Sequence, residues 1–422
     1  MKTRAAFLAA LATALLVHAA WAEPLPTAKP EQVGLSSQRL ERVGQSFKAQ
    51  IEQGRFPGAV VVIVRKGKIA YFETFGQRDP ATGAPMPKDA IFRLYSMTKP
   101  FASVGAMMLV EDGKLTLADP VSKYLPQLAT LQVAVPKQDA DGKTTYTLVP
   151  AERPITVQDL LRHTSGFVYS NNTTNQRVKE AYLATGVDWR DVTPAEQIER
   201  LAKVPLAHQP GTVWEYSLST DVLGRVVEAV SGMPLSVFLG ERLFAPLKMT
   251  DTAFVVPKQK VSRLAQPFAT DKATGKPIEL LDVTVAQKND AGGAGSAATA
   301  GDYARFLQMM LNGGQLGGVR LLSRATVAYM TADHLDTIKP AIPVLQPGYG
   351  FGLGFAVRKG GGVNNTIGSA GEYNWGGAAG TGFWIDPKEQ LIAIMMTQTV
   401  PGPAQRFDRA LFRHAVYQAI VD

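Results

Sequence analysis

The sequence predicts an α/β (α+β) protein, in which an antiparallel sheet from both ends of the chain is flanked by helices and a mainly helical domain is inserted. Two observations support this prediction. Runs of β-branched and aromatic residues around short turns occur near residues 59–75 and 380–396, as in antiparallel hairpins. Between them, apolar residues recur at helical spacing. We therefore expect the active site at the seam between the sheet and the helical region.

The first 22 residues have the features of a signal peptide. Lys2 and Arg4 precede an apolar run, and Ala20-Trp21-Ala22 is a small-x-small cleavage site. We expect cleavage near Glu23 and an exported protein, either periplasmic or secreted. The apolar run is too short for a transmembrane helix, and no later stretch approaches the roughly 20 apolar residues that a span needs. We therefore expect no stable membrane span after cleavage.

Residues 23–95 and 297–422 form the predicted sheet domain. Apolar side chains at helical spacing over residues 36–53 predict an amphipathic helix at its start. The next run, residues 59–64, is apolar at every position, which predicts a strand buried on both faces. A Lys-Gly-Lys turn at residues 66–68 leads into its hairpin partner.

Residues 96–296 form the predicted helical domain, which carries the nucleophile helix and a tyrosine motif. Polar residues 171–205 predict a helical, loop-rich insertion that faces the substrate. We expect residues 131–154 to be irregular, with a turn at Asp141-Gly142, and a tight glycine loop at Gly292–Ser296. Periodicity and capping residues predict the helices of this domain at 101–110, 156–161, 221–230 and 234–247.

The chain then returns to the sheet domain. A helix is predicted at residues 302–311, and a last amphipathic helix at residues 404–420. Between them, bulky residues alternate with glycine from Gly348 to Phe355, which predicts one strand with a bulky face and a bare face. The second hairpin follows at residues 380–396.

The composition argues against several classes of function. The 422-residue chain has a net charge of +8, but its basic residues are scattered singly, so we expect no nucleic-acid partner. It has no cysteine, which excludes disulfides and a cysteine nucleophile. No His-Glu-x-x-His pair, phosphate loop or dinucleotide fingerprint occurs, so we expect neither a metal nor a cofactor. The absence of Gly-x-Ser-x-Gly argues against an α/β-hydrolase.

Ser96 is the candidate nucleophile. Lys99 follows it by three residues and precedes an apolar helical run, so the amine and the hydroxyl lie on one face of a helix. A serine nucleophile needs an adjacent base, and a desolvated lysine is one recognised solution. The N–H groups at the helix N-terminus also stabilise an oxyanion that develops beside the serine. The simpler interpretation of the pair is a helix-capping serine with a solvated lysine.

Further motifs in the same order favour the catalytic interpretation. With them, the chain resembles the serine β-lactamase-like hydrolases of the class C and penicillin-binding-protein branch, and within that branch the β-lactamase-fold (family VIII) carboxylesterases. The likeness spans nearly the whole mature chain and implies the β-lactamase/transpeptidase-like fold. It rests on Ser96-Met97-Thr98-Lys99, on residues 160–166, on residues 210–217, on residues 292–305 and on residues 349–354.

The resemblance implies a role for Tyr216, which opens the second motif, Tyr216-Ser217-Leu218. Its phenol relays a proton together with Lys99, first from Ser96 and later to the leaving group. The simpler interpretation of Tyr216 is a buried aromatic residue that is hydrogen-bonded through its hydroxyl. Leu218 stands where the family has an asparagine, which removes an amide partner for a substrate amide.

The third motif departs from the β-lactamases, which have Lys-Thr-Gly on a strand beside the nucleophile. This chain offers Trp375-Gly376-Gly377-Ala378, although Gly361-Gly362 and Gly371 are other candidates for the register. The two glycines permit close backbone approach, and the Ala378 N–H then pairs with the Ser96 N–H as the oxyanion hole. Trp375 cannot meet a carboxylate as lysine does. We expect Trp375, Gly376, Gly377, Leu218 and Tyr95 to contact the substrate.

These features predict a serine hydrolase that cleaves carboxylic esters through a Ser96 acyl-enzyme, with a small-molecule ester as partner. A β-lactamase, a D-aminopeptidase or another cell-wall peptide hydrolase is the first alternative, and a cation such as Arg93 or Arg162 at the carboxylate position would favour it. A non-catalytic penicillin-binding-like module is the second. Ser165, close to His163, is interpreted as part of a structural turn.

Overall fold

The structure is a computed structural model. It describes residues 25–187, 191–272, 274–341, 344–360, 362–400 and 403–422, and for residues 403–407 the backbone alone. The expected signal peptide lies outside these residues.

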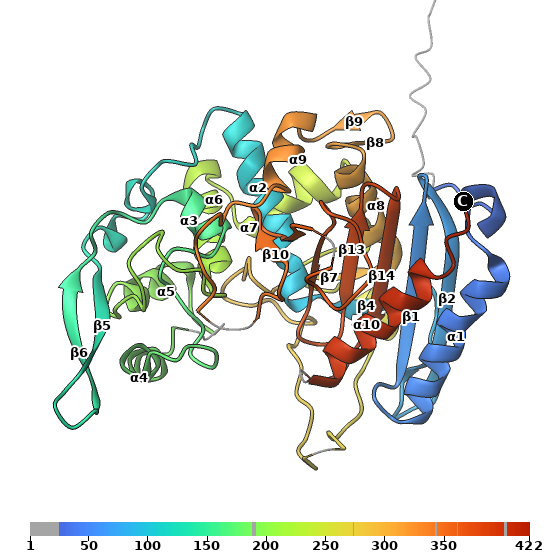
Figure 1. The fold of residues 1–422 in the computed structure, drawn as a ribbon, viewed down its shortest axis with the longest axis horizontal. Coiled ribbons are helices and arrows are strands. Elements are labelled where there is room, and N and C mark those ends of the chain that lie inside the picture. The colour runs from blue at the N-terminus through green and yellow to red at the C-terminus, as the bar shows by residue number, and fades with distance from the viewer. Residues whose placement is uncertain (1–24, 188–190, 273, 342–343, 361, 401–402) are drawn as a thin grey trace, which may run out of the picture.

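The described residues form one antiparallel sheet of eight strands, in the order β10-β11-β12-β13-β14-β1-β2-β3 (Figure 1). Strand β1 pairs with β14 on one side and with β2 on the other, so the two ends of the chain meet inside the sheet. This confirms the predicted fold class. The strands are β1 Gly58–Arg65, β2 Lys68–Asp79, β3 Ala84–Pro85, β10 Tyr349–Phe351, β11 Ala356–Arg358, β12 Tyr373–Gly376, β13 Gly382–Asp386 and β14 Leu391–Thr397.

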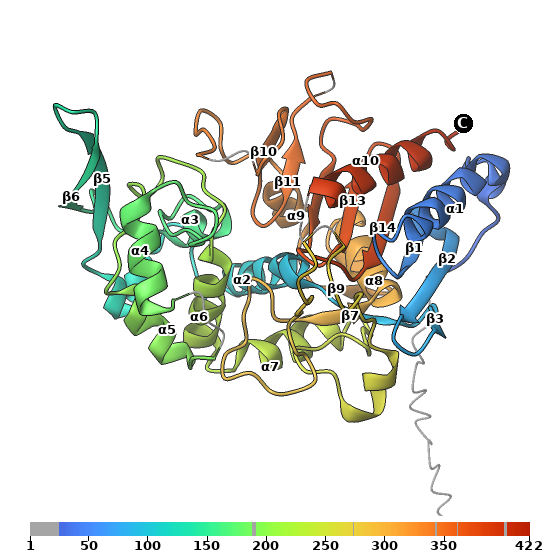
Figure 2. The same cartoon turned by 90° about the horizontal axis from the view of Figure 1, so that it is seen from below.

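Helices cover both faces of this sheet (Figures 1 and 2). Helices α1 (Ser37–Glu52) and α10 (Pro403–Tyr417) pack together on one face, and α8 (Ala300–Leu311) packs against β1 and β14 on the other. Strand β1 is buried along its whole length, as its apolar run predicts. Its alternate residues enter two separate cores, with Val61 and Ile63 under α1 and Val60 and Val62 under α8.

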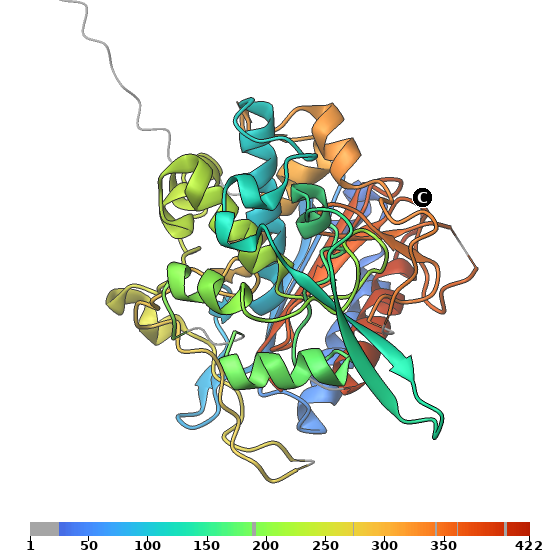
Figure 3. The same ribbon diagram turned by 90° about the vertical axis from the view of Figure 1, so that its left-hand side faces the viewer.

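The helical region forms a second lobe beside the sheet (Figures 1 and 3). Its first helix is α2 (Lys99–Glu111), in which residues 99–109 are all buried. The other helices of this lobe are α3 Val157–Leu161, α4 Gln176–Thr185, α5 Pro194–Leu201, α6 Ser219–Ser231 and α7 Leu235–Leu239. Helix α9 (Arg324–Met330) follows α8 in the chain. Short 3-10 or π turns are η1 Pro30–Val33, η2 Tyr95–Thr98, η3 Val121–Lys123, η4 Pro126–Leu128, η5 Gly240–Phe244 and η6 Lys258–Arg263.

Three short strand pairs complete the secondary structure of the described residues. Strand β4 (Ile91–Arg93) pairs with β7 (Ala297–Thr299), and this pair joins the segment before the nucleophile to the segment after the glycine loop. Strands β8 (Gln315–Leu316) and β9 (Val319–Arg320) form a tight hairpin. The third pair is the hairpin of β5 (Gln132–Gln138) and β6 (Thr144–Pro150), which projects from the helical lobe (Figure 3).

Two local predictions were wrong. Residues 131–154 are not irregular but form the β5–β6 hairpin, although the expected turn lies at its tip. The strand signal is weak because β6 is exposed or only half-buried at every position and both strands contain a proline. Likewise, residues 349–355 are not one strand. Gly352 N–H donates to the Phe355 carbonyl and Gly354 has a φ of 98°, so the chain reverses there into β11.

Among the described residues, no single helix has the length and apolar character to cross a membrane. One bent pair, Ser219–Ser231 with Leu235–Phe244, passes on length and composition together, and its two helices meet at 79°.

Candidate active site

Ser96 lies in the 3-10 turn η2, directly before α2. Tyr95 has a φ of 47°, a left-handed conformation that is costly for a residue with a side chain. Contacts with later parts of the chain hold the turn in this conformation. The Leu94 N–H donates to the Ser296 carbonyl (2.9 Å), and the Tyr303 hydroxyl donates to the Met97 carbonyl (3.0 Å). Ser96 is left partly exposed at the head of a helix whose following residues are buried.

Ser96, Lys99 and Tyr216 meet at this turn. The Tyr216 hydroxyl lies 2.6 Å from Ser96 Oγ, and Lys99 Nζ lies 3.4 Å from the same oxygen. Lys99 Nζ also sits 4.7 Å from the centre of the Tyr216 ring. The structure thus brings together three residues that are up to 120 positions apart in the chain.

Lys99 is buried, with 1% of its surface exposed. Its Nζ donates to the Gly293 carbonyl (2.8 Å) and to the Tyr169 hydroxyl (3.1 Å). The Gly293 N–H in turn donates to Asp221 Oδ1 (3.0 Å), which fixes this carbonyl. The Gly293, Tyr169 and Ser96 oxygens therefore surround the Lys99 amine and hold it close to Ser96.

Tyr216 is positioned by aromatic packing in the loop before α6. Its ring lies 5.0 Å from the His163 ring and 5.2 Å from the Trp375 ring, between centroids, and only 9% of the residue is exposed. Contacts of this kind fix the ring plane, so the hydroxyl has one direction in which to point.

The His163 ring packs against the Tyr216 ring, and its hydrogen bond goes to Ser217 and not to Ser165. Its Nδ1 lies 3.1 Å from Ser217 Oγ, while Ser165 and Ser217 both bond to the Ser219 hydroxyl. Burial, and secondly the nearby Lys99, lower the pKa of the His163 imidazole well below its usual range. His163 is therefore neutral at physiological pH, and the segment acts as a buried, hydrogen-bonded support.

The third predicted motif lies at the end of β12, beside the nucleophile turn. A Cβ on Gly377 would collide with the Leu94 carbonyl oxygen, so only glycine permits this approach. Gly377 and Ala378 line the same cavity as Ser96 and Tyr216. Of the other candidates for this motif, Gly362 and Gly371 are not among the residues that line this cavity, and Gly361 lies outside the described residues.

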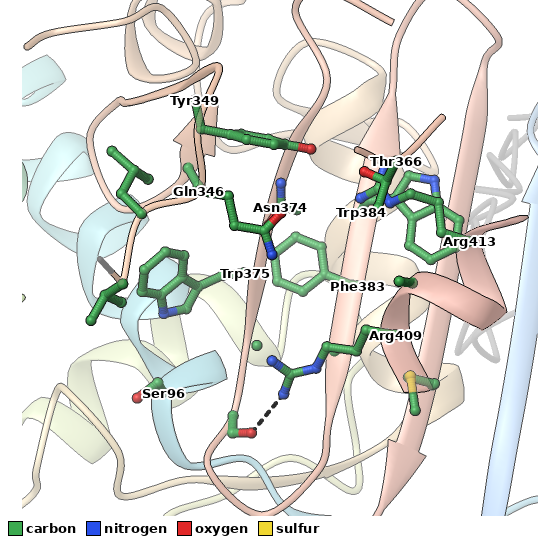
Figure 4. A pocket seen from close by; sticks show the side chains of 18 of the residues that line it. Ser96, Gln346, Tyr349, Thr366, Asn374, Trp375, Phe383, Trp384, Arg409 and Arg413 are labelled. Atoms are coloured by element: carbon green, nitrogen blue, oxygen red, sulfur yellow. Dashed lines mark hydrogen bonds between the residues drawn. The ribbon is translucent and has the colours of Figure 1, made fainter. Parts of the chain in front are cut away.

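This cavity has a volume of about 730 Å³, within the range of small-molecule sites. It is a hollow between Ser96, the end of β12 and helix α10 (Figure 4). Apolar and aromatic groups line much of it, with polar side chains added from several loops. The polar and aromatic lining side chains include Asn172, Gln346, Tyr349, Thr366, Asn374, Trp375, Phe383 and Trp384.

Two of the expected substrate contacts lie elsewhere. The Tyr95 hydroxyl accepts a hydrogen bond from the Leu281 N–H (2.8 Å), and Tyr95 is not among the residues that line this cavity. Leu218 is buried at the start of α6 and lines a second cavity of about 350 Å³, together with Tyr169 and Asp221. Trp375, Gly376 and Gly377 do line the first cavity.

Sequence reasoning missed two side chains near the site. Tyr169, which contacts Lys99, lies three residues after the Gly166 turn and just before the predicted insertion at residues 171–205, where no motif singled it out. Arg409 lines the cavity from α10, where an arginine on an amphipathic helix gives no signal of its own. The two arginines considered earlier are engaged elsewhere. Arg93 donates to the Ala265 and Leu281 carbonyls, and Arg162 donates to the His334 carbonyl and pairs with Asp159.

No group of three or more histidine, aspartate or glutamate side chains is placed to hold a metal ion in the part of the chain that the structure describes.

An antiparallel sheet with helices on both faces, and with a Ser-x-x-Lys turn beside β12 that enters a buried helix, defines the β-lactamase/transpeptidase-like fold. The chain belongs to the beta-lactamase family, because the family model described as Beta-lactamase matches residues 43–418. The predicted resemblance is thereby confirmed.

Individual relatives refine this position. Esterase EstB of Burkholderia gladioli is 31% identical over 400 residues, which cover 89% of this chain and 93% of EstB. The solved structure of EstCE1, described as a hydrolase with promiscuous acyltransferase activity, has a TM-score of 0.75 and 29% identity, covering 90% of this chain and 99% of EstCE1. Unliganded simvastatin synthase (LovD) from Aspergillus terreus, as its selenomethionyl derivative, has a TM-score of 0.74 and 25% identity, covering 90% and 98%.

Proposed function

We propose that this protein is a serine hydrolase that cleaves carboxylic esters through an acyl-enzyme on Ser96. One observation carries the proposal: the Ser96 hydroxyl lies within 2.6 Å of the Tyr216 hydroxyl and 3.4 Å of Lys99 Nζ, at the edge of a cavity of ligand size. A nucleophile in hydrogen-bond reach of groups that exchange protons is the pattern expected for acyl transfer.

The first step forms the acyl-enzyme. The Tyr216–Lys99 pair begins the cycle one proton short of full protonation. It accepts the Ser96 proton as Oγ attacks the ester carbonyl, and it returns that proton to the departing alkoxide as the C–O bond breaks. In the second step, a water molecule gives a proton to the pair and attacks the acyl carbon. The acid leaves as Ser96 recovers its proton, so protons balance over the cycle.

The Ser96 and Ala378 N–H groups are the proposed oxyanion hole. Ser96 stands at the head of α2, where helix N–H groups are not used within the helix. Ala378 follows Gly377, which packs against the Leu94 carbonyl and so brings this backbone to the nucleophile turn. Removal of one such donor from an oxyanion hole typically lowers kcat by about 10²–10³-fold.

The composition of the cavity favours esters over amides. Trp375 occupies the position at which β-lactamases have the lysine of Lys-Thr-Gly, and its ring packs on Tyr216. Leu218 stands where the second motif of the family has an asparagine, so no amide side chain is present there. Leu218 lines the second cavity and not the one beside Ser96. The likeness to EstB and EstCE1 supports the same choice. No observation favours the β-lactamase, peptidase or binding-module alternatives over it.

The test is the rate of p-nitrophenyl butyrate hydrolysis by the protein and by Ser96→Ala. A matched control is Ser262→Ala, since Ser262 is exposed on η6, away from the cavity. We expect the Ser96 variant to lose at least 10³-fold in kcat and the control to keep the parent rate. Equal rates in the parent and in Ser96→Ala would refute the nucleophile assignment.

Acyl transfer to an alcohol other than water is a second candidate. The likeness to EstCE1, a hydrolase with promiscuous acyltransferase activity, supports it, and a cavity of about 730 Å³ has room for an acceptor. Addition of 1-butanol to the p-nitrophenyl butyrate assay would yield butyl butyrate, measured by gas chromatography. A yield of butyl butyrate that does not exceed the uncatalysed background would contradict acyl transfer and leave hydrolysis as the proposed reaction.

We also propose that the protein is exported, on the strength of its N-terminal sequence pattern. Expression in a Gram-negative host should give a periplasmic protein whose mass corresponds to cleavage after Ala22. An intact N-terminus on a protein that stays in the cytoplasmic fraction would contradict this.

A further inference from the structure

Asp221 is a buried carboxylate to which the proposed mechanism gives no role. It lies in the first turn of α6, five residues after Tyr216, and only 8% of the residue is exposed. Its Oδ1 accepts a hydrogen bond from the Gly293 N–H (3.0 Å), and the carbonyl of the same glycine accepts one from Lys99 Nζ (2.8 Å). One residue of the glycine loop therefore connects this carboxylate to the amine beside Ser96.

The glycine loop reaches the carboxylate because it lacks side chains. A Cβ on Gly292 would lie 2.6 Å from the Thr220 carbonyl oxygen, and a Cβ on Gly293 would lie 2.4 Å from Asp221 Oδ2. Cβ atoms do not approach other atoms so closely, so neither position accepts a side chain unless the loop moves. The loop therefore lies directly on the first turn of α6, and both polar backbone groups of Gly293 are bound there.

The two members of the proton-transfer pair belong to different helical segments. Lys99 begins α2 and Tyr216 precedes α6, and these helices pack against each other (Figure 2). The Asp221 N–H donates to the Leu218 carbonyl (2.8 Å), which fixes the carboxylate relative to the loop that carries Tyr216. The contact through Gly293 therefore ties Lys99 to the tyrosine segment.

In the part of the chain that the structure describes, no carboxylate pairs directly with Lys99. Its amine bonds instead to one carbonyl and two hydroxyl oxygens. Burial of a cation is costly, and an anion held nearby offsets part of that cost. Asp221 is such an anion, because its bond to Gly293 holds it one residue away from the amine. Its charge therefore favours the protonated form of the Tyr216–Lys99 pair.

Other charged groups lie around Asp221 on α6 and on the glycine loop. Arg225, one turn later on α6, pairs with Glu228 (3.0 Å) and donates to the Asp290 carbonyl (2.6 Å). Burial lowers the pKa of Arg225, and the charges of Glu228, Asp221 and Asp290 oppose this effect. The titratable groups near the amine itself are Tyr169, Tyr216 and His163. Of these acids, Asp221 is the one bound to the residue that holds Lys99.

We propose that Asp221 is a positioning residue for the esterase reaction. Through Gly293 it holds Lys99 beside Ser96. Its negative charge also raises the pH below which the Tyr216–Lys99 pair is fully protonated and inactive. This inference rests on the proposed esterase function and adds the group that sets its pH range. A purely structural role, as an acid that complements the dipole of α6, would change stability and leave the pH profile as it is.

The experiment records kcat and kcat/KM for p-nitrophenyl butyrate from about pH 5 to about pH 10. The variants are Asp221→Asn, which keeps the size and the hydrogen-bond acceptor without the charge, and Asp221→Ala, which loses both. The control is Glu241→Gln, because it removes one negative charge from an exposed site on η5. Urea unfolding is measured on each protein, and if Asp221→Ala does not fold, Asp221→Asn carries the test.

The acidic limb of the kcat/KM profile marks the uptake of the last proton by the Tyr216–Lys99 pair. We expect Asp221→Asn to move this limb down by about one pH unit, while kcat on the plateau stays within about tenfold of the parent value. Asp221→Ala should show the same shift and a further loss in kcat of about 10–10²-fold, because Lys99 is no longer held in place. Glu241→Gln should match the parent in both quantities.

An acidic limb of Asp221→Asn that stays in place or moves up would overturn the inference, and a loss of stability alone would assign Asp221 to the first turn of α6. An equal shift in Glu241→Gln would attribute the effect to net charge and would also overturn it. Equal kcat values of the two Asp221 variants would overturn the positioning role. In each of these cases hydrolysis by the parent leaves the esterase function standing. No hydrolysis by any of the proteins, the parent included, would refute that function and this inference with it.

Discussion

The Tyr216 hydroxyl offers the sharpest test of the site, because one atom can be removed while the packing stays. In Tyr216→Phe the 2.6 Å contact with Ser96 Oγ is lost. The ring still packs against His163, Trp375 and Tyr169, so the loop before α6 keeps its shape. The variant therefore separates proton transfer from architecture.

The expected effect on rate is large and the effect on stability is small. General acid–base groups contribute about 10²–10⁴-fold, which corresponds to about 3–5 kcal/mol in the activation free energy. The loss of one hydrogen bond costs only about 1 kcal/mol in the free energy of unfolding. We expect kcat for p-nitrophenyl butyrate to fall by 10²–10⁴-fold, and the midpoint of urea unfolding to change little.

The assay pairs this variant with Tyr169→Phe. The Tyr169 hydroxyl contacts Lys99 Nζ at 3.1 Å, so it acts on Ser96 only through Lys99. We expect a loss of about tenfold for Tyr169→Phe, since Lys99 keeps its bond to the Gly293 carbonyl. Steady-state kinetics and urea unfolding are measured on both proteins. If Tyr216→Phe kept its rate within threefold while Tyr169→Phe lost it, the roles of the two tyrosines would be reversed and our reasoning refuted.

Three further outcomes follow from the same contacts. Lys99→Met keeps the length of this buried side chain without its amine, so it should lower kcat by at least 10³-fold while urea unfolding stays cooperative. A rate within tenfold of the parent would contradict the part of Lys99 in proton transfer. Gly377→Ala should lose activity and about 1–3 kcal/mol of stability through the clash with the Leu94 carbonyl. The control Gly240→Ala, with open space around its Cβ, should be neutral or stabilising in the same assays. Equal effects of the two substitutions would contradict the packing argument. Burial lowers the pKa of His163 in the folded state, so below about pH 6.5 the unfolded state binds a proton that the folded state does not. The free energy of unfolding should therefore fall as the pH falls below that value, by up to about 1.4 kcal/mol per pH unit. His163→Asn should flatten this slope in urea unfolding between pH 7 and pH 5, and an unchanged slope would contradict the prediction.

The sequence by itself determined the elements whose residues carry a local periodic signal. The two hairpins were predicted because residues 59–64 of β1 are all apolar and because β13 and β14 are largely apolar around a short turn. The buried helix α2 was predicted from the run after Lys99. The β5–β6 hairpin was missed because most of it is exposed and full burial is confined to Val133 and Ala134, so burial imposes no apolar pattern along its length.

Tertiary structure alone decided how the parts of the site meet. Lys99 is three residues from Ser96, so helical spacing foretold their contact, but the 2.6 Å approach of Tyr216 depends on packing across 120 residues. The bond from Lys99 to the Gly293 carbonyl has no sequence signal, because every residue has a carbonyl. Arg409 reaches the cavity only because Gly376 and Gly382 face each other across two strands. Local pattern reports what each segment buries, whereas register and packing decide which distant atoms become neighbours.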